Sequence, residues 1–445
     1  MARGRFLCAE GQQVQPSQLR RNAVYHVVDG VFFFAAMALF SAEVVIPAMI
    51  SELSDSALLL ALVPFLMWVC TLAPQILFTR KVERLPYKKR VVAFTSLLQR
   101  LGWLILLISF FLHWGSPLTL VVFYLMLASV KLSTGLVIPV WSDWYAKTTP
   151  EPMWGRLLGI RRAVFGVLAL GLGPLIKWVM DTFPTPQRYQ ILLGAAVLCY
   201  WLSYGAVLLV HEDHEESPHG SEPLPLRHYL GDAFWILFRR RDFRRFLLGC
   251  MLTVIPLTLL ATFLTRYGLL APGVDRGITG TFTICFFTST AVGALLAGSM
   301  TDRLGPMAPF RVFPLLAFAS AVVAAASGRP AAVSAAFVLH GLAMGMRMVV
   351  VMPAVFRYSG PHRRALYMAV TFTCLGVANA LIPLVAGVVL DAGWADFRQV
   401  FLGCGAIALA GWLLLLSARI PDTASHSDAH DGPSSEKLRA TGAAP

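Results

Sequence analysis

Stretches of about twenty apolar residues, separated by short polar connectors, recur along almost the whole chain. A helix of about twenty residues is long enough to cross the hydrocarbon layer of a bilayer. The stretches begin near residues 22, 57, 91, 117, 158, 188, 245, 279, 311, 331, 366 and 397. The pattern therefore predicts an all-α integral membrane protein with twelve transmembrane helices.

The connectors alternate between strongly basic and nearly uncharged. Arg20 and Arg21 precede the first stretch and six basic residues lie between 80 and 90, whereas 113–117 carries almost no charge. Because basic connectors remain on the cytoplasmic side, we expect both termini to be cytoplasmic. No removable signal peptide and no Asn-x-Ser/Thr sequon are recognisable, which favours a bacterial cytoplasmic membrane.

The composition supports the membrane assignment and narrows the function. Hydrophobic residues make up 57% of the chain and charged residues only 14%, too few for the surface of a soluble protein. The net charge of +13 follows from the basic connectors, so we expect a lipid bilayer and no nucleic acid as partner. The seven cysteines lack paired spacing, and no catalytic constellation or Gly-rich phosphate loop occurs. We expect no enzyme activity, no metal and no cofactor.

The longest connector divides the chain into two halves. It begins with acidic residues and histidines and ends as a basic amphipathic segment, 229–246, that we expect to lie on the membrane surface. The expected parts are a cytoplasmic N-terminus (1–21), a six-helix bundle (22–210), a cytoplasmic linker (211–244), a second six-helix bundle (245–418) and a disordered cytoplasmic tail (419–445).

A short acidic motif occurs at the same place in each half. It reads Glu83-Arg84-Leu85-Pro86 after the second stretch and Asp302-Arg303-Leu304-Gly305 after the eighth. From Gly298 to Gly305 the second copy matches the signature Gly-x-x-x-Asp-Arg-x-Gly-Arg, departing at Pro306; the first copy departs at Thr79, Glu83, Pro86 and Tyr87. Over about residues 20–420 the sequence thus resembles the major facilitator superfamily.

The resemblance implies two pseudo-symmetric six-helix bundles around a central cavity and secondary transport of a small solute by a monomer. It also implies that Asp302 faces Arg156 and Arg161, and that Glu83 faces Arg363 and Arg364. We expect these pairs, with Arg84, Arg303, the turn residue Gly305 and Gly298, a glycine that permits close helix contact, to latch the cytoplasmic side. The alternative is that these are ordinary basic connectors without a latch.

Ionisable residues within the spans are candidates for function, because a buried charge is costly in a membrane. Asp29, Lys131 and Arg347 lie at similar depth in spans that the resemblance places around the cavity. We expect Asp29, assisted by His26, to couple transport to protons, and Lys131 and Arg347 to bind a polar or anionic solute. The alternative is an ion pair between Asp29 and Lys131 that only joins two helices. Asn379 could bond to solute or to a neighbouring helix.

Two further charges lie near the outer ends of their spans. Glu43 in the first span and Arg266 in the seventh occupy similar places in the two halves and could form an outer gate. Interfacial side chains that reach water would explain them as well. Arg100, in the middle of the third span, needs a partner, and we expect a structural one.

Two partial motifs leave other functions open. Lys131-x-x-x-Gly135 has the spacing of the superfamily's Arg-x-x-x-Gly motif, and Gly171-Leu172-Gly173-Pro174 resembles an element of its proton-coupled drug exporters. The glycine pair that should follow is replaced by Lys177 and Trp178. The expected function is secondary transport of a polar or anionic organic solute; the alternatives are a multidrug exporter and a non-transporting membrane scaffold or sensor.

Overall fold

The computed structural model describes residues 16–82, 87–115, 117–149, 153–212, 240–305, 307–359 and 364–418. Within these ranges, twelve helices are long and apolar enough to span a membrane, which confirms the predicted class. The expectations for the N-terminal 15 residues, the amphipathic part of the linker before 240 and the tail after 418 lie outside the described residues. The helices are α1 Pro16–Leu39, α2 Val45–Leu53, α3 Ala57–Val82, α4 Lys88–His113, α5 Pro117–Thr148, α6 Trp154–Thr182, α7 Gln187–Leu209, α9 Arg241–Leu269, α10 Ile278–Leu304, α11 Ala308–Ala326, α12 Pro330–Ser359, α13 Arg364–Asp391 and α14 Phe397–Ser417.

The first apolar stretch is not one continuous helix but is interrupted between α1 and α2. The ring of Pro47 excludes a helical bond to the carbonyl of Glu43. Ser41 supplies acceptors for the first N–H groups of α2, because its side-chain Oγ accepts from Val45 N at 3.2 Å and its carbonyl accepts from Ile46 N at 2.8 Å. Glu43, expected inside a helix, therefore lies in the turn.

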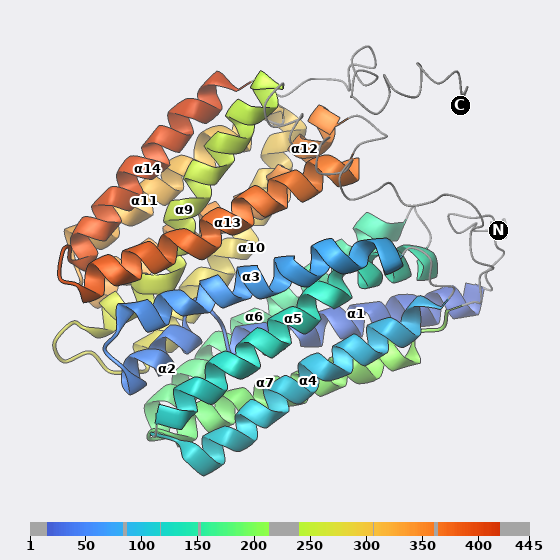
Figure 1. Ribbon diagram of the computed structural model, residues 1–445, viewed down its shortest axis with the longest axis horizontal. Coiled ribbons are helices and arrows are strands. Elements are labelled where there is room, and N and C mark those ends of the chain that lie inside the picture. The colour runs from blue at the N-terminus through green and yellow to red at the C-terminus, as the bar shows by residue number, and fades with distance from the viewer. Residues whose placement is uncertain are drawn as a thin grey trace. The chain divides into compact units, whose positions relative to one another are not determined.

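The chain forms two compact units, the first made of the described residues of Met1–Gly220 together with Leu269–Phe287. In it, α5 packs between α3 and α4, while α7 packs against α1 and α4 (Figure 1). Gly135 allows α5 to approach α3 closely, since a side chain there would overlap the carbonyl of Thr71. This close contact explains the glycine of the Lys131-x-x-x-Gly135 motif.

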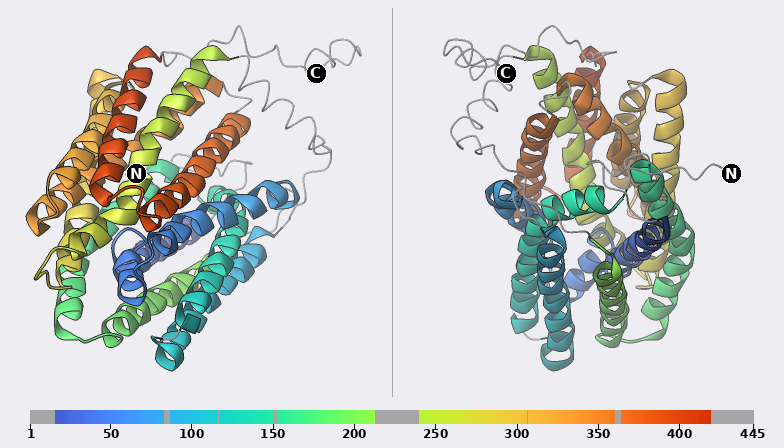
Figure 2. Two further views of the ribbon diagram at one scale, coloured as in Figure 1. Left: turned by 60° about the vertical axis from the view of Figure 1, so that its left-hand side comes forward. Right: turned by 90° about the vertical axis from the view of Figure 1, so that its right-hand side faces the viewer.

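The second unit comprises the described residues of Ser221–Gly268 and Thr288–Pro445. There α11 packs against α12 and α14, and α12 packs against α13; Figure 2 shows these helices from two further directions. Its core is aromatic: the ring of Phe246 in α9 lies 5.3 Å from that of Phe310 in α11, and Phe243 lies 4.7 Å from Tyr367 in α13. Large rings hold together helices that are distant in sequence.

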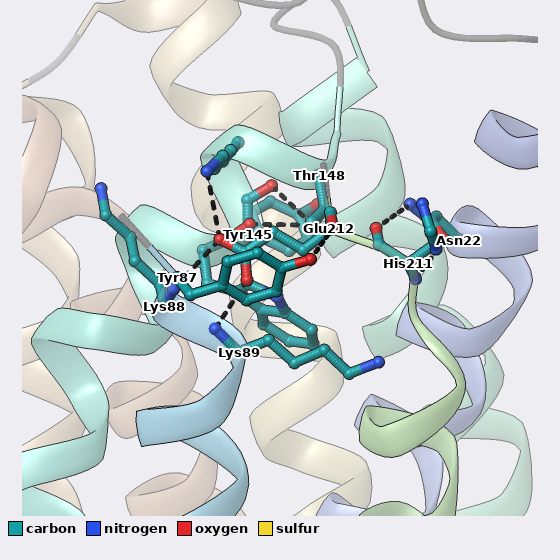
Figure 3. A network of polar contacts seen from close by, with 10 residues as sticks. Asn22, Tyr87, Lys88, Lys89, Tyr145, Thr148, His211 and Glu212 are labelled. Carbon is teal, nitrogen blue, oxygen red and sulfur yellow. Dashed lines mark hydrogen bonds and ion pairs between the residues drawn. The ribbon is translucent and has the colours of Figure 1, made fainter. Parts of the chain in front are cut away.

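The connector after α7 is anchored to the first unit (Figure 3). The buried carboxylate of Glu212 accepts from the backbone N–H groups of Lys88 at 3.1 Å and Lys89 at 2.6 Å, and pairs with Lys147 Nζ at 3.3 Å. An acid at this position satisfies free N–H groups and the positive end of α4. Residues 211 and 212, expected in a solvated linker, therefore belong to the packed end of the bundle.

Candidate functional site

Asp29 lies in the middle of α1 and is 5% exposed. Its Oδ2 is paired with Nη2 of Arg161 in α6 at 3.2 Å, and Arg161 is also 5% exposed. α6 begins at Trp154, so Arg161 is two turns inside the helix, about 10 Å beyond its start. Asp29 therefore lies in the middle of its span, Gln18–Leu39, whereas Arg161 lies close to the start of the span Gly159–Thr182.

The second oxygen of Asp29 connects it to another arginine. Ser203 in α7 donates its hydroxyl to Asp29 Oδ1 at 2.7 Å and accepts from Arg100 Nη2 at 3.0 Å. Arg100, in α4, is buried and also donates to the carbonyl of Tyr200 at 3.3 Å. Asp29 thus lies between two arginines, one bound directly and one through a hydroxyl.

The remaining bonds of Arg100 hold it in place. Its Nη1 donates to Gln99 Oε1 at 2.7 Å, and Gln99 Nε2 donates to Thr134 in α5 at 2.8 Å. The guanidinium also lies over the rings of Tyr200 and Tyr204 at about 6 Å. Arg100 therefore has the structural partners that its position required, and the polar network extends over α1, α4, α5, α6 and α7.

Arg161 is less completely bonded than Arg100. Its guanidinium lies 5.0 Å from the ring of Trp141, but neither Nε nor Nη1 has a hydrogen-bond partner among the described residues, although both atoms are buried. A methyl group built on Gly30 would overlap the guanidinium, so Arg161 occupies the space that a glycine leaves on α1. The arginine has two donors to spare in a confined position.

His26 lies one turn before Asp29 and is fully buried. The Thr148 hydroxyl donates to the carbonyl of Trp144 at 2.8 Å, so its oxygen accepts from His26 Nε2 at 2.9 Å. This fixes the proton of the neutral ring on Nε2 and leaves Nδ1 as an acceptor without a partner in the described part of the chain. The charge of Arg161 also acts on this ring.

Tyr145 closes the same region from α5. Its ring stacks on Trp141 at 5.2 Å and meets His26 at 5.0 Å. Burial raises the pKa of Tyr145 to about 12, against a smaller opposing effect of Arg161, so its hydroxyl stays protonated at neutral pH. These aromatic residues are therefore uncharged. Among the described residues, the charges that interact here are those of Asp29, Arg161 and Arg100, one negative and two positive.

The structure does not bring Lys131 to Asp29. The ion-pair partner of Asp29 is Arg161, and Lys131 in α5 instead attracts the partly buried Glu43 in the turn between α1 and α2. Burial raises the pKa of Glu43, and the charge of Lys131 offsets part of that increase. The alternative of an Asp29–Lys131 ion pair is thus not realised, and two separate associations take its place.

Two candidate residues lie in the second unit. Arg347 in α12 is partly buried, with Nη1 at 3.9 Å from Met344 Sδ, and has no carboxylate partner among the residues described there. Asn379 in α13 is buried and accepts a hydrogen bond from the Thr258 hydroxyl in α9. Asn379 therefore joins two helices of its own unit. Arg266 is buried near the end of α9.

The signature residues are only partly described. Gly305 ends α10 with φ of 87°, a conformation that favours glycine, and Arg303 before it is exposed. Gly298 is not a close-contact position, because a side chain there would meet none of the described atoms within 4 Å. Arg161, expected to face Asp302, is bound to Asp29. Glu83, Arg84 and Arg363, and the side chains of Arg156, Asp302 and Arg364, lie outside the described residues.

A cluster of polar contacts around one acid at the predicted outer end went unrecognised in the sequence. Glu52, in the last turn of α2, accepts from the hydroxyls of Thr185 and of Tyr189, the latter at 2.9 Å. Its carboxylate also lies 3.9 Å from Arg188 Nη1 and 3.7 Å from Nε of Arg276, which precedes α10. Its position beside a polar connector was the only available signal, and that is equally typical of a solvated acid.

The exporter-like element of α6 has a packing role. Gly173 faces Ile284 of α10, which occupies the space that a side chain would need, and α6 continues through Pro174. Lys177 pairs with Asp181 at 2.8 Å on the exposed side of the same helix. This glycine therefore serves a close contact between α6 and α10.

Comparison with known proteins agrees with this architecture. Residues 270–442 match the family model of the Major Facilitator Superfamily. No curated protein matches the chain as a whole or in part. Similar solved structures include a point mutant of the nucleoside transporter NupG (TM-score 0.69, 12% identity, 89% of this chain and 99% of that one) and a D-xylose–proton symporter (0.65, 14%, 91% and 98%).

A bacterial homologue of the human lysosomal transporter Spinster, inward-facing and unoccupied, is also similar (TM-score 0.59, 12% identity, 91% of this chain and 96% of that one). At these identities the likenesses concern the fold, and they extend over nearly the whole chain. The family match is confined to residues 270–442, and the structural likenesses show that the chain shares the fold of these transporters. With twelve described helices long and apolar enough to cross a membrane, the chain is a multi-pass membrane protein.

Proposed function

We propose that the chain, acting as a monomer, moves a small polar or anionic organic solute across the membrane by alternating access, coupled to protons through Asp29. One observation carries the proposal: the Asp29 carboxylate is buried within a span and is held by partners from two other helices, Arg161 and Ser203. A carboxylate in that setting binds a proton when its cationic partner moves away.

The groups around Asp29 determine when its carboxylate binds or releases a proton. Arg161 and Arg100 favour the ionised carboxylate, while His26, one turn away, donates to Thr148 instead of to the carboxylate. Separation of α6 from α1 would take Arg161 away from Asp29. Within a span, a protonated Asp29 would then cost less free energy than an ionised one. Movement of helices is in this way linked to uptake and release of a proton.

The solute remains open within its class. The fold is shared with a nucleoside transporter and a D-xylose–proton symporter, so nucleosides and pentoses are reasonable first probes. Lys131 and Arg347 are proposed as further contacts for the polar or anionic part of the solute. The cationic excess around Asp29 adds organic acids to the set of probes.

Solute-driven proton movement tests the proposal. Proteoliposomes containing pyranine would be given uridine, D-xylose or L-lactate, and one class should change the internal pH. Asp29→Asn should reduce this proton movement at least tenfold and leave solute counterflow in place, because the neutral amide holds the shape but binds no proton. Asp55→Asn, at an exposed acid, is the matched control. Proton movement at the wild-type rate in Asp29→Asn would refute the role of Asp29.

A further inference from the structure

The strongest unexplained feature of the first unit is the bonding deficit of Arg161. Asp29 uses only Nη2, and the N–H groups on Nε and Nη1 are buried without acceptors among the described residues. A buried donor that lacks an acceptor is costly, and a further group that binds there would remove this cost. Arg161 therefore lacks hydrogen-bond acceptors, and an anion would provide them.

The charge of the region points the same way. Arg100 and Arg161 face a single carboxylate, and no second acid joins them in the described part of the first unit. An uncompensated positive charge within a span calls for an anionic partner. The guanidinium already donates to the carboxylate of Asp29 at 3.2 Å, and carboxylates match its planar donors well.

Arg161 is also held in a fixed position, as a binding group must be. It lies over Trp141 at 5.0 Å and fills the space next to Gly30, where any larger residue would displace it. Close by, His26 presents Nδ1 as a buried acceptor without a donor in the described residues. One wall of the region is thus cationic and aromatic, and beside it is a neutral acceptor suited to a hydroxyl or amide.

We propose that Arg161 binds the carboxylate of an organic acid solute in place of Asp29, and that Gly30 is the positioning residue that keeps the guanidinium in reach. The inference rests on the proposed transport function and adds the solute class. Because Asp29 and the solute compete for the same cation, occupancy by the solute frees Asp29 to bind a proton.

Thermal unfolding of the purified full chain in detergent provides the test. Acetate, L-lactate, benzoate and succinate would each be compared with the corresponding amide at constant ionic strength. At least one acid should raise the melting temperature saturably while its amide does not. Equal responses to acid and amide, or no response to any of the four acids, would overturn the proposal.

The variants separate binding from folding. Arg161→Gln should weaken binding of the responding acid at least tenfold, whereas Arg329→Gln, the same change at an exposed arginine, should leave it unchanged. Gly30→Ala should weaken binding similarly while keeping every charge, and it decides the matter if Arg161→Gln fails to fold. Unchanged affinity in Gly30→Ala and in a folded Arg161→Gln would contradict the assignment.

Asp29→Asn distinguishes this inference from the proposed coupling. Removal of the competing carboxylate should tighten acid binding at least threefold, although the same variant is expected to lose proton movement. Weaker acid binding in Asp29→Asn would overturn the competition. Tighter binding together with intact proton movement would support the anion site and refute the coupling role.

Discussion

At the scale of single residues, the absence of a side chain decides how closely two helices approach. Gly135 brings the backbone of α5 against the carbonyl of Thr71 in α3, where no larger residue fits. Gly166, inside α6, would meet none of the described atoms within 4 Å if it carried a methyl group. The same residue type therefore has opposite packing requirements at these two positions.

Substitution of these glycines should separate packing from helix propensity. Gly135→Ala is expected to destabilise the protein by roughly 1–3 kcal/mol through overpacking, which exceeds the gain of about 1 kcal/mol in helix propensity. Gly166→Ala should gain helix propensity without any overpacking, so the stability of the protein should be unchanged or increased. Thermal unfolding in detergent would measure both, and a Gly135→Ala variant as stable as Gly166→Ala would contradict the close contact.

The residues of the site were partly predictable. Asp29 and His26 could be found in the sequence because polar groups within an apolar stretch are conspicuous. The partner of Asp29 could not, since Arg161 follows Arg156 in a basic segment that is typical of an interfacial connector. Only the start of α6 at Trp154 shows that Arg161 is two turns inside a helix, and only the packing of α1 on α6 brings the two charges together.

At the scale of elements, one helix begins on an acid from a distant part of the chain. α4 has no side-chain cap of its own, and Glu212 from the connector after α7 bonds to its first two backbone N–H groups. The hydroxyl of Tyr87 donates to the carbonyl of Glu212 at 3.3 Å (Figure 3). The end of α7 and the start of α4 are therefore stabilised as a single structure.

Replacing the charge of Glu212 should lower the stability of the packed end formed by α4 and α7. Glu212→Gln replaces a charged acceptor by a weaker one and removes the ion pair with Lys147, for an expected loss of about 1–3 kcal/mol. Asp242→Asn, at an exposed acid in the first turn of α9, should change stability by less than about 0.5 kcal/mol. Equal melting temperatures for the two variants would argue against the cap.

The elements themselves were largely predictable, and their ends were not. Twelve apolar stretches gave twelve spans because the length of a helix in a bilayer is fixed by the hydrocarbon thickness. The interruption after Leu39 was missed because proline alone does not produce it: α3 continues through Pro64 and Pro74. At Pro47 the nearby Ser41 offers a substitute cap, and that combination ends one helix and starts the next.

At the scale of the whole molecule, one polar contact joins parts of the chain that come from different halves of the sequence. Glu52 in α2 holds Arg276, which lies in the connector between α9 and α10. Both belong to the first compact unit, where Gly280 at the start of α10 also packs directly on Lys177 of α6. Transport by alternating access requires such contacts at one end of the helices to break during the cycle.

Loss of the Glu52 contacts should favour opening at that end. Thr279, buried beside this contact, would be changed to cysteine in a chain whose native cysteines are replaced. Glu52→Gln is expected to increase the labelling rate of this cysteine by a membrane-impermeant maleimide at least threefold. Asp55→Asn, nearby and exposed, should have no effect. Identical labelling rates in the two backgrounds would refute a gating role of Glu52.

The course of α7 has a mechanical consequence. Near its start Tyr189 binds Glu52, about 21 Å further along Ser203 binds Asp29, and just beyond its end His211 N donates to Asn22 at 2.9 Å. α7 contains no proline, whereas the first apolar stretch is interrupted between α1 and α2. A shift of α7 along its own axis would strain all three of these contacts at once. A displacement at one end of α7 would therefore be transmitted to its other end without passing through the interrupted first span.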